Sequence, residues 1–584
     1  MSLSPVQKVS ILTLATLGLI PIPHVEAQEP AGGGNPGVFF ESVDVDVVNV
    51  EVFVTDKKGN AVTGLTREDF SLRVDGTEVP VSNFYSEVLG RPVQEGQDLA
   101  LLDQQDSFEA TPLEQRLHLV VFVDNANIRA PNRKRVFKAL REFLDNSLSP
   151  DDRVTVASIS KSVFTHSDFL NDRRVINLAL DDVEKASAND FIHEFERREI
   201  YSELFREETT AVLRGEVDRQ IARSTEDINR GGILNRIRAY AQSEFDRSRS
   251  GLRHLGAYVD SLAGVPGRKA LIHVSDSIPN NPGEGMFIAW NERFRGTLAA
   301  EDYQIQVGQF DLRDQFRELG QRANAARVTM YTLDAESSHT SAIRSAVTDG
   351  VIPNLSLSTI ESNYREPLEF VATATGGRRV QANPTLARQL SAISTDFNTF
   401  YSLGFQAVEK GSKNHHDIEV KLARKGLVVR HRNNYTRKNR EQRMASATVA
   451  ALLYNSVSNP LEVSLTKGLG KKRDDGSVAV PVELKIPVSK LVLLPTEGIH
   501  AAQLSLFVTI KDKQGDPRPV QRIPFNLRIP DEFVEQAKAD SAQYTLPVVL
   551  RPGDQQIAIG VRDDIGATSS TLRIELNPRL AGAV

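Results

Sequence analysis

The chain has 584 residues, a formal net charge of −6, 40% hydrophobic residues and no cysteine. This length is enough for about three or four ordinary apolar cores, and the lack of cysteine excludes disulfides, thiolate metal sites and cysteine nucleophiles. Charges of both signs are interspersed along the chain, so the sequence offers no basic face for nucleic acid.

The start of the chain is typical of a signal peptide. Lys8 precedes an apolar run over residues 9–22, and Val25-Glu26-Ala27 resembles a small-residue cleavage signal. The run is too short, and too interrupted by proline, for a comfortable membrane span, and no later stretch is long and apolar enough. We therefore expect cleavage near Ala27 and an exported protein, secreted or periplasmic, with no transmembrane segment.

A small β module is expected after a Gly/Pro-rich tether at residues 28–37. Apolar and polar residues alternate over residues 43–54, residues 56–60 are typical of a turn, and a second strand follows at 71–79. This period of two predicts an antiparallel module over residues 38–90. A polar linker at 91–116 separates it from the next domain.

Residues 117–127, LHLVVFVDNAN, predict an apolar strand that ends in Asp124 and leads into a helix with a basic first turn. A run of Val and Leu suits a strand buried on both faces of a parallel sheet. The pattern recurs at residues 269–276, KALIHVSD, which end in Asp276. Because α/β proteins bind ligands at the carboxyl ends of parallel strands, these two carboxylates could share one divalent cation.

Residues 189–260 lie between these strands and carry many Arg and acidic side chains, with apolar positions mostly three to five residues apart. This spacing predicts long amphipathic helices, which the Gly231-Gly232 pair would divide into two. The resulting hairpin is either a docking arm for a partner or an enlarged helix packed on its own sheet. We favour the second interpretation after Gly231, and expect residues 189–230 to pack less tightly than the elements on either side.

The later part of the chain offers few candidates for catalysis. His415-His416-Asp417 is interpreted as an exposed turn rather than a zinc site, because adjacent strand residues point to opposite faces. The basic residues 421–438 are interpreted as the solvated side of a strand pair and a linker, with a polyanion site as the alternative. Eight segments from residue 444 onward, the first of them ASATVAALLY at 445–454, predict a sandwich of about seven strands. No nucleophile elbow, zinc-protease motif or Walker-type loop occurs, so no enzyme is expected.

The order of the central segments resembles the von Willebrand factor type A (VWA) domain. Residues 117–127 are followed by an amphipathic helix at 133–144, a strand within SPDDRVTVASIS at 149–160, KALIHVSD, the strand RVTMYTLDA at 327–335 and a helix ending in Thr-Gly-Gly at 375–377. The flanking segments 50–84 and 400–435 resemble a large group of bacterial secreted "VWFA-related" proteins. The resemblance covers residues 39–435, about two thirds of the chain.

The resemblance implies a metal-ion-dependent adhesion site that holds a divalent ion, usually Mg²⁺, through an Asp-x-Ser-x-Ser element. Residues 124–128 read Asp-Asn-Ala-Asn-Ile, so both serine positions are lost. Asp124 and Asp276 are the expected ligands of a weak Mg²⁺ site, with Asn127 and Ser187 as further candidates. The alternative is that Asp124 caps the following helix or hydrogen-bonds the loops, and that no metal binds.

The sequence thus predicts a multidomain α/β plus β protein whose central domain is doubly wound and Rossmann-like. The divisions are a signal peptide at 1–27, a tether at 28–37, a β module at 38–90, a linker at 91–116, a VWA-like domain at 117–406 with a helical insertion at about 189–260, a hairpin and basic linker at 407–443, and a C-terminal β-sandwich at 444–584. We expect a non-enzymatic protein that binds a protein ligand through the degenerate site. The alternative is a structural or assembly component of the cell envelope with no metal-dependent binding.

Overall fold

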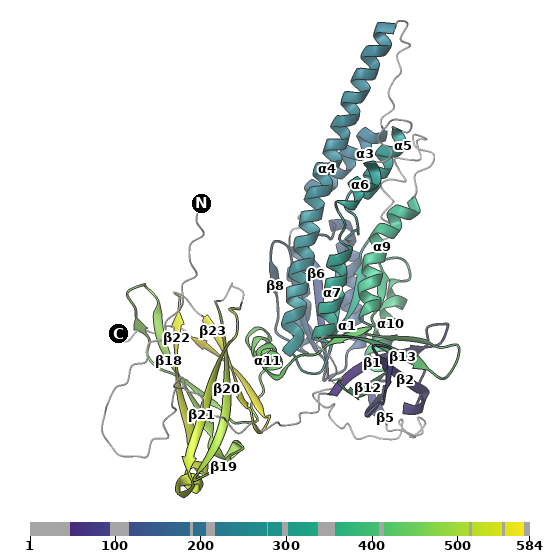
Figure 1. The fold of residues 1–584 in the computed structure, drawn as a ribbon. Coiled ribbons are helices and arrows are strands. Elements are labelled where there is room, and N and C mark those ends of the chain that lie inside the picture. Colours follow the sequence, from purple (N-terminus) through teal and green to yellow (C-terminus); the bar gives the residue numbers. More distant parts are fainter. Residues whose placement is uncertain are drawn as a thin grey trace.

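The computed structural model describes residues 47–93, 116–186, 191–205, 216–276, 278–294, 302–336, 357–407, 414–512, 517–551 and 555–576. Figure 1 shows a central α/β domain from which a long helix projects, a β module below it, and a pair of β sheets reached through one helix. The expected signal peptide, the tether, most of the linker and Ser187 lie outside the described residues.

Six strands form the central sheet in the order β11-β10-β9-β6-β7-β8. All neighbours pair in parallel except β8, which is antiparallel to β7. Every residue of β9 is buried, as its apolar run predicts. The strands are β6 (Leu117–Asp124), β7 (Arg153–Ile159), β8 (Val163–Thr165), β9 (Arg268–Ser275), β10 (Val328–Asp334) and β11 (Arg379–Gln381).

Helices cover both faces of this sheet. One apolar core contains side chains of α1 (Ala130–Ser147), α2 (Arg173–Lys185) and α10 (Leu386–Asn398). The core on the other face contains side chains of α4 (Glu216–Ser261), α7 (Arg313–Ala326), α9 (Leu357–Ala374) and η3 (Leu262–Gly264). The predicted helix at 133–144 is the middle of α1, and its apolar positions are buried: Val136, Phe137, Leu140, Phe143 and Leu144.

The insertion differs from its prediction, because α4 continues through Gly231 and Gly232 as one helix of 46 residues. A glycine in a helix costs about 1 kcal/mol relative to alanine, and the burial of Ile233 and Ile237 immediately afterwards offsets that cost. α3 (Phe191–Phe205) packs against α4. None of the helices in the described ranges combines the length and apolarity needed to cross a membrane.

A helical cap lies at the carboxyl end of the sheet. It consists of α3, the first half of α4, α5 (Glu284–Arg293), α6 (Asp302–Gly308) and the start of α9 (Figure 1). These elements share a separate apolar core that includes Ile200, Tyr201, Leu204, Ile233, Ile237, Tyr240, Met286, Phe287, Trp290 and Ile360. The described part of α3 is therefore anchored by buried side chains.

The β module is built from segments on both sides of the central domain. Its sheets have the orders β14-β1-β12-β4-β5 and β15-β13-β2-β3, and they enclose one apolar core. The predicted domain limit at Gln406 is wrong, because β12 pairs with β1 and β4 rather than with the central sheet. The strands are β1 (Val47–Thr55), β2 (Phe70–Val74), β3 (Thr77–Val79), β4 (Asn83–Val88), β5 (Arg91–Val93), β12 (Phe400–Gln406), β13 (His415–Leu422), β14 (Val428–His431) and β15 (Asn434–Thr436), with η1 (Arg67–Asp69) before β2.

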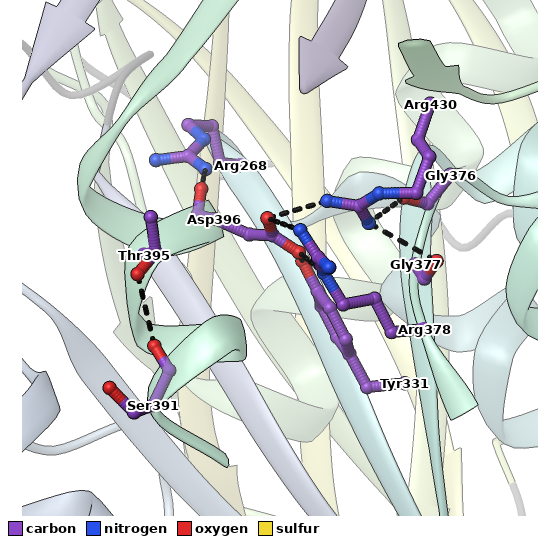
Figure 2. Close-up of polar contacts among 9 residues, drawn as sticks. All are labelled: Arg268, Tyr331, Gly376, Gly377, Arg378, Ser391, Thr395, Asp396 and Arg430. Atoms are coloured by element: carbon purple, nitrogen blue, oxygen red, sulfur yellow. Dashed lines mark hydrogen bonds and ion pairs between the residues drawn. The ribbon is translucent and has the colours of Figure 1, made fainter. Parts of the chain in front are cut away.

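A buried carboxylate fastens this module to the central domain (Figure 2). Asp396 on α10 accepts hydrogen bonds from Arg378 at 2.9 Å and from Arg430 of β14 at 2.6 Å. Arg430 also donates to the carbonyl oxygens of Gly376 and Gly377. The interpretation of residues 421–438 as a solvated side is therefore wrong for Arg430, which binds the β module to the central domain.

The prediction of an exposed turn at residues 415–417 is also wrong. These residues begin β13, and His416 is 3% exposed. Its Nδ1 lies 2.8 Å from Asp75 Oδ2, and its ring stacks on Tyr435. The pairing of β13 with β2, far away in sequence, creates this environment.

The C-terminal part begins with a helix where a strand was predicted. α11 (Arg440–Tyr454) starts at a capping box made by Asn439 and Gln442, and the Ala-rich sequence that follows has high helix propensity. Two sheets then face each other around one core. Their elements are β16 (Ser464–Lys467), β17 (Lys471–Lys472), β18 (Val478–Pro487) and β22 (Ser541–Leu550) in one sheet; β19 (Leu494–Thr496), β20 (Ile499–Asp512), β21 (Gln521–Pro530), β23 (Gln555–Asp563) and β24 (Ser569–Leu576) in the other; and the short helices η4 (Val488–Lys490), η5 (Asp531–Phe533) and α12 (Val534–Lys538).

Candidate functional site

Asp124 and Asp276 lie at neighbouring strand ends, as the sequence predicts. β6 and β9 are adjacent and parallel, with Val123 opposite Val274, so Asp124 ends its strand one register position before Asp276. Asp124 is 2% exposed and Asp276 is 8% exposed. Both carboxyl groups are thus removed from water and need partners within the protein.

Asp124 holds the loop that follows its own strand. Its Oδ1 accepts hydrogen bonds from the backbone N–H groups of Ala126 and Asn127, both at 3.1 Å. Its Oδ2 accepts from Asn127 Nδ2 at 2.7 Å. Burial raises the pKa of Asp124 to about 6, although the hydrogen bonds from Asn127 oppose the rise.

His273 on β9 lies beside Asp124, with 4.0 Å between His273 Nε2 and Asp124 Oδ2. Burial lowers the pKa of His273 to about 4. The imidazole is therefore neutral near pH 7, and the contact is not an ion pair under those conditions. The sequence contains this histidine within KALIHVSD, but nothing local marked it as a neighbour of Asp124.

Asp276 is held by the start of the α1 region. Its Oδ2 accepts from Arg129 N at 2.7 Å and from Arg129 Nε at 3.0 Å, and its Oδ1 accepts from Asn132 Nδ2 at 3.0 Å. Its own N–H donates to Asn127 O at 2.7 Å. Burial raises the pKa of Asp276, and the Arg129 guanidinium is the largest effect opposing that rise.

Two arginines connect this edge to its surroundings. Arg129 also forms an ion pair with Glu336, which follows β10. Arg247 on α4 donates to the carbonyl oxygen of Ala126 at 2.7 Å and is held by Glu244 at 2.6 and 2.9 Å. The long helix thus reaches the β6–α1 loop and fixes it.

The topology agrees with the segments on which the resemblance rests. In chain order β6, α1, β7, β9 and β10 follow one another in that family's sequence of elements, and α9 ends at the Thr-Gly-Gly before edge strand β11. The central domain is VWA-like. The inserted α3 and α4 come between α2 and β9.

Comparisons with known proteins add context. No protein-family model and no curated protein sequence matches the chain. Among solved structures, an aerotolerance-related membrane protein from Bacteroides fragilis is 9% identical over 48% of this chain and 98% of that chain, with a TM-score of 0.23. Manganese-loaded TRAP protein from Plasmodium vivax is 11% identical over 56% and 97%, with a TM-score of 0.23. A von Willebrand factor type A protein from Catenulispora acidiphila is 9% identical over 80% and 67%, with a TM-score of 0.22. These values are too low to transfer any function.

The residues of the VWA-like domain, as arranged, do not fit a Mg²⁺ site. Mg²⁺ requires near-octahedral oxygen coordination, yet the Asp276 carboxylate accepts from Arg129 and Asn132, and Asn127 directs its amide nitrogen toward Asp124. Ile128, at a lost serine position, is fully buried in the core. No group of three or more His, Cys, Asp or Glu side chains that could hold a metal occurs among the residues that the structure describes. Calorimetric titration of Mg²⁺ tests whether the predicted metal site exists.

Proposed function

We propose that the protein is an exported, non-enzymatic interaction protein that binds a protein partner at the capped end of its VWA-like domain without a metal ion. One observation carries the proposal. Arg129 and Asn132 hold the carboxylate at the strand end, and Arg247 holds the adjoining loop. Because these side chains already hold the strand ends and the loop in place, the surface needs no cation to keep its shape. Partner binding at this surface therefore does not depend on a metal ion.

The chemistry of the edge suits a structural role better than a catalytic one. A general base must reach the proton that it abstracts. Asp124 and Asp276 are instead buried and hydrogen-bonded to neighbouring groups of the same chain. The signal-peptide-like sequence at residues 1–27 supports export.

The outer side of the cap offers an anchor for a partner. Phe195 on α3 is 59% exposed, while Ile200, Tyr201 and Leu204 of the same helix are buried in the cap core. Exposed aromatic side chains, phenylalanine among them, are enriched at protein interfaces. We therefore place the partner contact around Phe195.

The test is capture from the envelope fraction of the producing cell, with full-length mature protein as bait. Wild type, Phe195→Ser and Phe164→Ser are compared, each with and without EDTA. Phe164 on β8 is 63% exposed and pairs with Ser158 in the central sheet, so it belongs to the sheet rather than to the cap helices and serves as the control. We expect wild type and Phe164→Ser to retain the same partner in both buffers, and Phe195→Ser to lose it. Release by EDTA would contradict metal independence, and capture unaffected by Phe195→Ser would contradict the surface.

A second candidate is a structural or assembly component of the cell envelope, in which the VWA-like domain is a rigid spacer. α11 favours it, because this helix packs against η3 of the central domain and against β20, β23 and β24 of the C-terminal sheets. A spacer would make its contacts through the C-terminal sheets. This candidate would be supported if wild type captures a partner in both buffers and Phe195→Ser captures the same partner.

A further inference from the structure

A cavity of about 330 Å³ lies where the central domain, the β module and α11 meet. Five cationic side chains line it, and none of its lining residues within the described ranges is acidic. The cations come from separate parts of the chain: the α7–β10 turn, the β14–β15 connection, the residues after β15 and α11. They are Arg327, Arg432, Arg437, Lys438 and Arg443.

Arg432 is the most buried of these cations, at 9% exposed. Its two amino groups donate to backbone carbonyl oxygens, Nη1 to Asn324 at 3.3 Å and Nη2 to Asn49 at 2.8 Å. Its buried Nε has no hydrogen-bond partner. Arg430, two residues earlier, is instead neutralised by Asp396 (Figure 2). Arg432 therefore brings a guanidinium charge to the cavity without a hydrogen-bonded carboxylate.

Burial and nearby charges both act on Arg432 and Lys438. Burial lowers the pKa of Arg432 to about 10, with Arg327 adding to the lowering, and burial also lowers the pKa of Lys438. Two carboxylates oppose these effects: Glu51 acts on Arg432 and Asp260 acts on Lys438. Glu51 lines a smaller adjoining cavity and lies 3.6 Å from the guanidinium of Arg268, so its charge is shared. Burial of the Arg432 guanidinium without a hydrogen-bonded carboxylate is unfavourable, and an anion in the cavity would offset that cost.

The cavity wall also has an apolar part, beside polar residues such as Asn49, Asn324 and Ser446. Val47 and Val48 of β1 and Val265 and Pro266 before β9 contribute to it. The volume falls near the lower end of the roughly 300–1,000 Å³ range of small-molecule sites. Guanidinium groups bind oxyanions through paired N–H donors. The cavity thus combines a cationic part with an apolar part.

We propose that this cavity binds a small organic phosphate, with the phosphate group near Arg432, Arg437 and Lys438 and the organic group against Val265 and Pro266. The site is separate from the capped end of the VWA-like domain and does not depend on the function proposed there. Because three bodies of the chain contribute side chains, a bound phosphate ester also stabilises their junction.

The test is calorimetric titration of phenyl phosphate into full-length mature protein at low ionic strength, with inorganic phosphate as a parallel titrant. Arg432→Gln removes the buried cation but can also prevent folding. The main variant is therefore Arg437→Gln combined with Lys438→Gln, since Arg437 is exposed and Lys438 is only partly buried. The control is Arg528→Gln, an exposed arginine on β21.

We expect one saturable site for phenyl phosphate, at least tenfold weaker binding in the double variant and unchanged binding in the control. Phenyl phosphate is expected to bind more tightly than inorganic phosphate, and both to weaken with added chloride. Absence of saturable heat at millimolar phenyl phosphate would overturn the proposal. So would equal affinity in the double variant, or inorganic phosphate binding as tightly as the ester.

Discussion

Replacement of Arg129 by alanine tests whether this guanidinium occupies the role of a cation at the strand ends. The side chain of Arg129 is 22% exposed, and it lies between Asp276 at 8% and Glu336 at 9% side-chain exposure. Removal of one partner from a buried ion pair costs about 3–5 kcal/mol, because the other charge stays buried. Since Arg129 is partly exposed, we expect Arg129→Ala to lower the opening free energy by the lower end of this range, ~3 kcal/mol.

The loss should depend on pH. Burial raises the pKa of Asp276 in the folded protein and Arg129 limits the rise, so Arg129→Ala raises that pKa further. A carboxyl group whose folded pKa is raised loses stability as the pH rises from its unfolded value through the folded one. The deficit of Arg129→Ala is therefore largest near pH 7 and shrinks as the pH falls and Asp276 takes up a proton.

Hydrogen exchange of the buried amides of β6 and β9, under conditions where exchange reports the opening free energy, measures the effect. A loss of ~3 kcal/mol corresponds to roughly a hundredfold faster exchange. Lys134→Ala, an exposed cation on α1, is the control and should stay within about 0.5 kcal/mol of wild type. Exchange in Arg129→Ala within threefold of wild type at pH 7 would refute the reasoning.

Three further outcomes are expected. As the pH rises from about 4 to about 6, the free energy of unfolding of the wild type should fall by about 3 kcal/mol, because the folded pKa of Asp124 is about 6. Asp124→Asn should lack this part of the pH dependence in urea unfolding. An unchanged profile would show that Asp124 is not the group responsible. Gly264→Ala should lower the melting temperature and loosen α11, because a Cβ there would lie 2.0 Å from Ser446 O. Gly232→Ala, whose added Cβ would have no atom within 4 Å, should instead stabilise α4 by up to about 1 kcal/mol. Equal melting curves for the two variants would contradict the close contact at Gly264. In hydrogen exchange, the described part of α3 should exchange faster than β6 and β9, and equal protection would make the cap part of the core.

Local patterns predicted the central sheet, because the apolar runs of β6 and β9 specify buried strands whatever their partners. They did not predict that β12 belongs to the β module, since that depends on pairing with β1, more than 300 residues earlier. The α11 helix had a local signal that the strand interpretation missed, the capping box of Asn439 and Gln442.

The candidate site was predicted in part. Each aspartate stands at the end of an apolar strand, and that local signal placed both side chains correctly at one edge of the sheet. Arg129 gave no comparable signal, because its partner Asp276 lies 147 residues away and becomes a neighbour only through the sheet. Arg247 gave no such signal either, because it lies 121 residues from Ala126 and reaches it only where α4 crosses the edge of the sheet.

The most direct test of the central claim, that side chains of the protein take the place of a metal ion at the strand ends, is calorimetric titration of Mg²⁺ into the metal-free wild-type protein near pH 7. We predict no saturable heat up to millimolar Mg²⁺, because Arg129 and Asn132 already hold the Asp276 carboxylate. Saturable binding of one Mg²⁺ per chain that disappears in Asp276→Asn would contradict the account and restore a metal-dependent site.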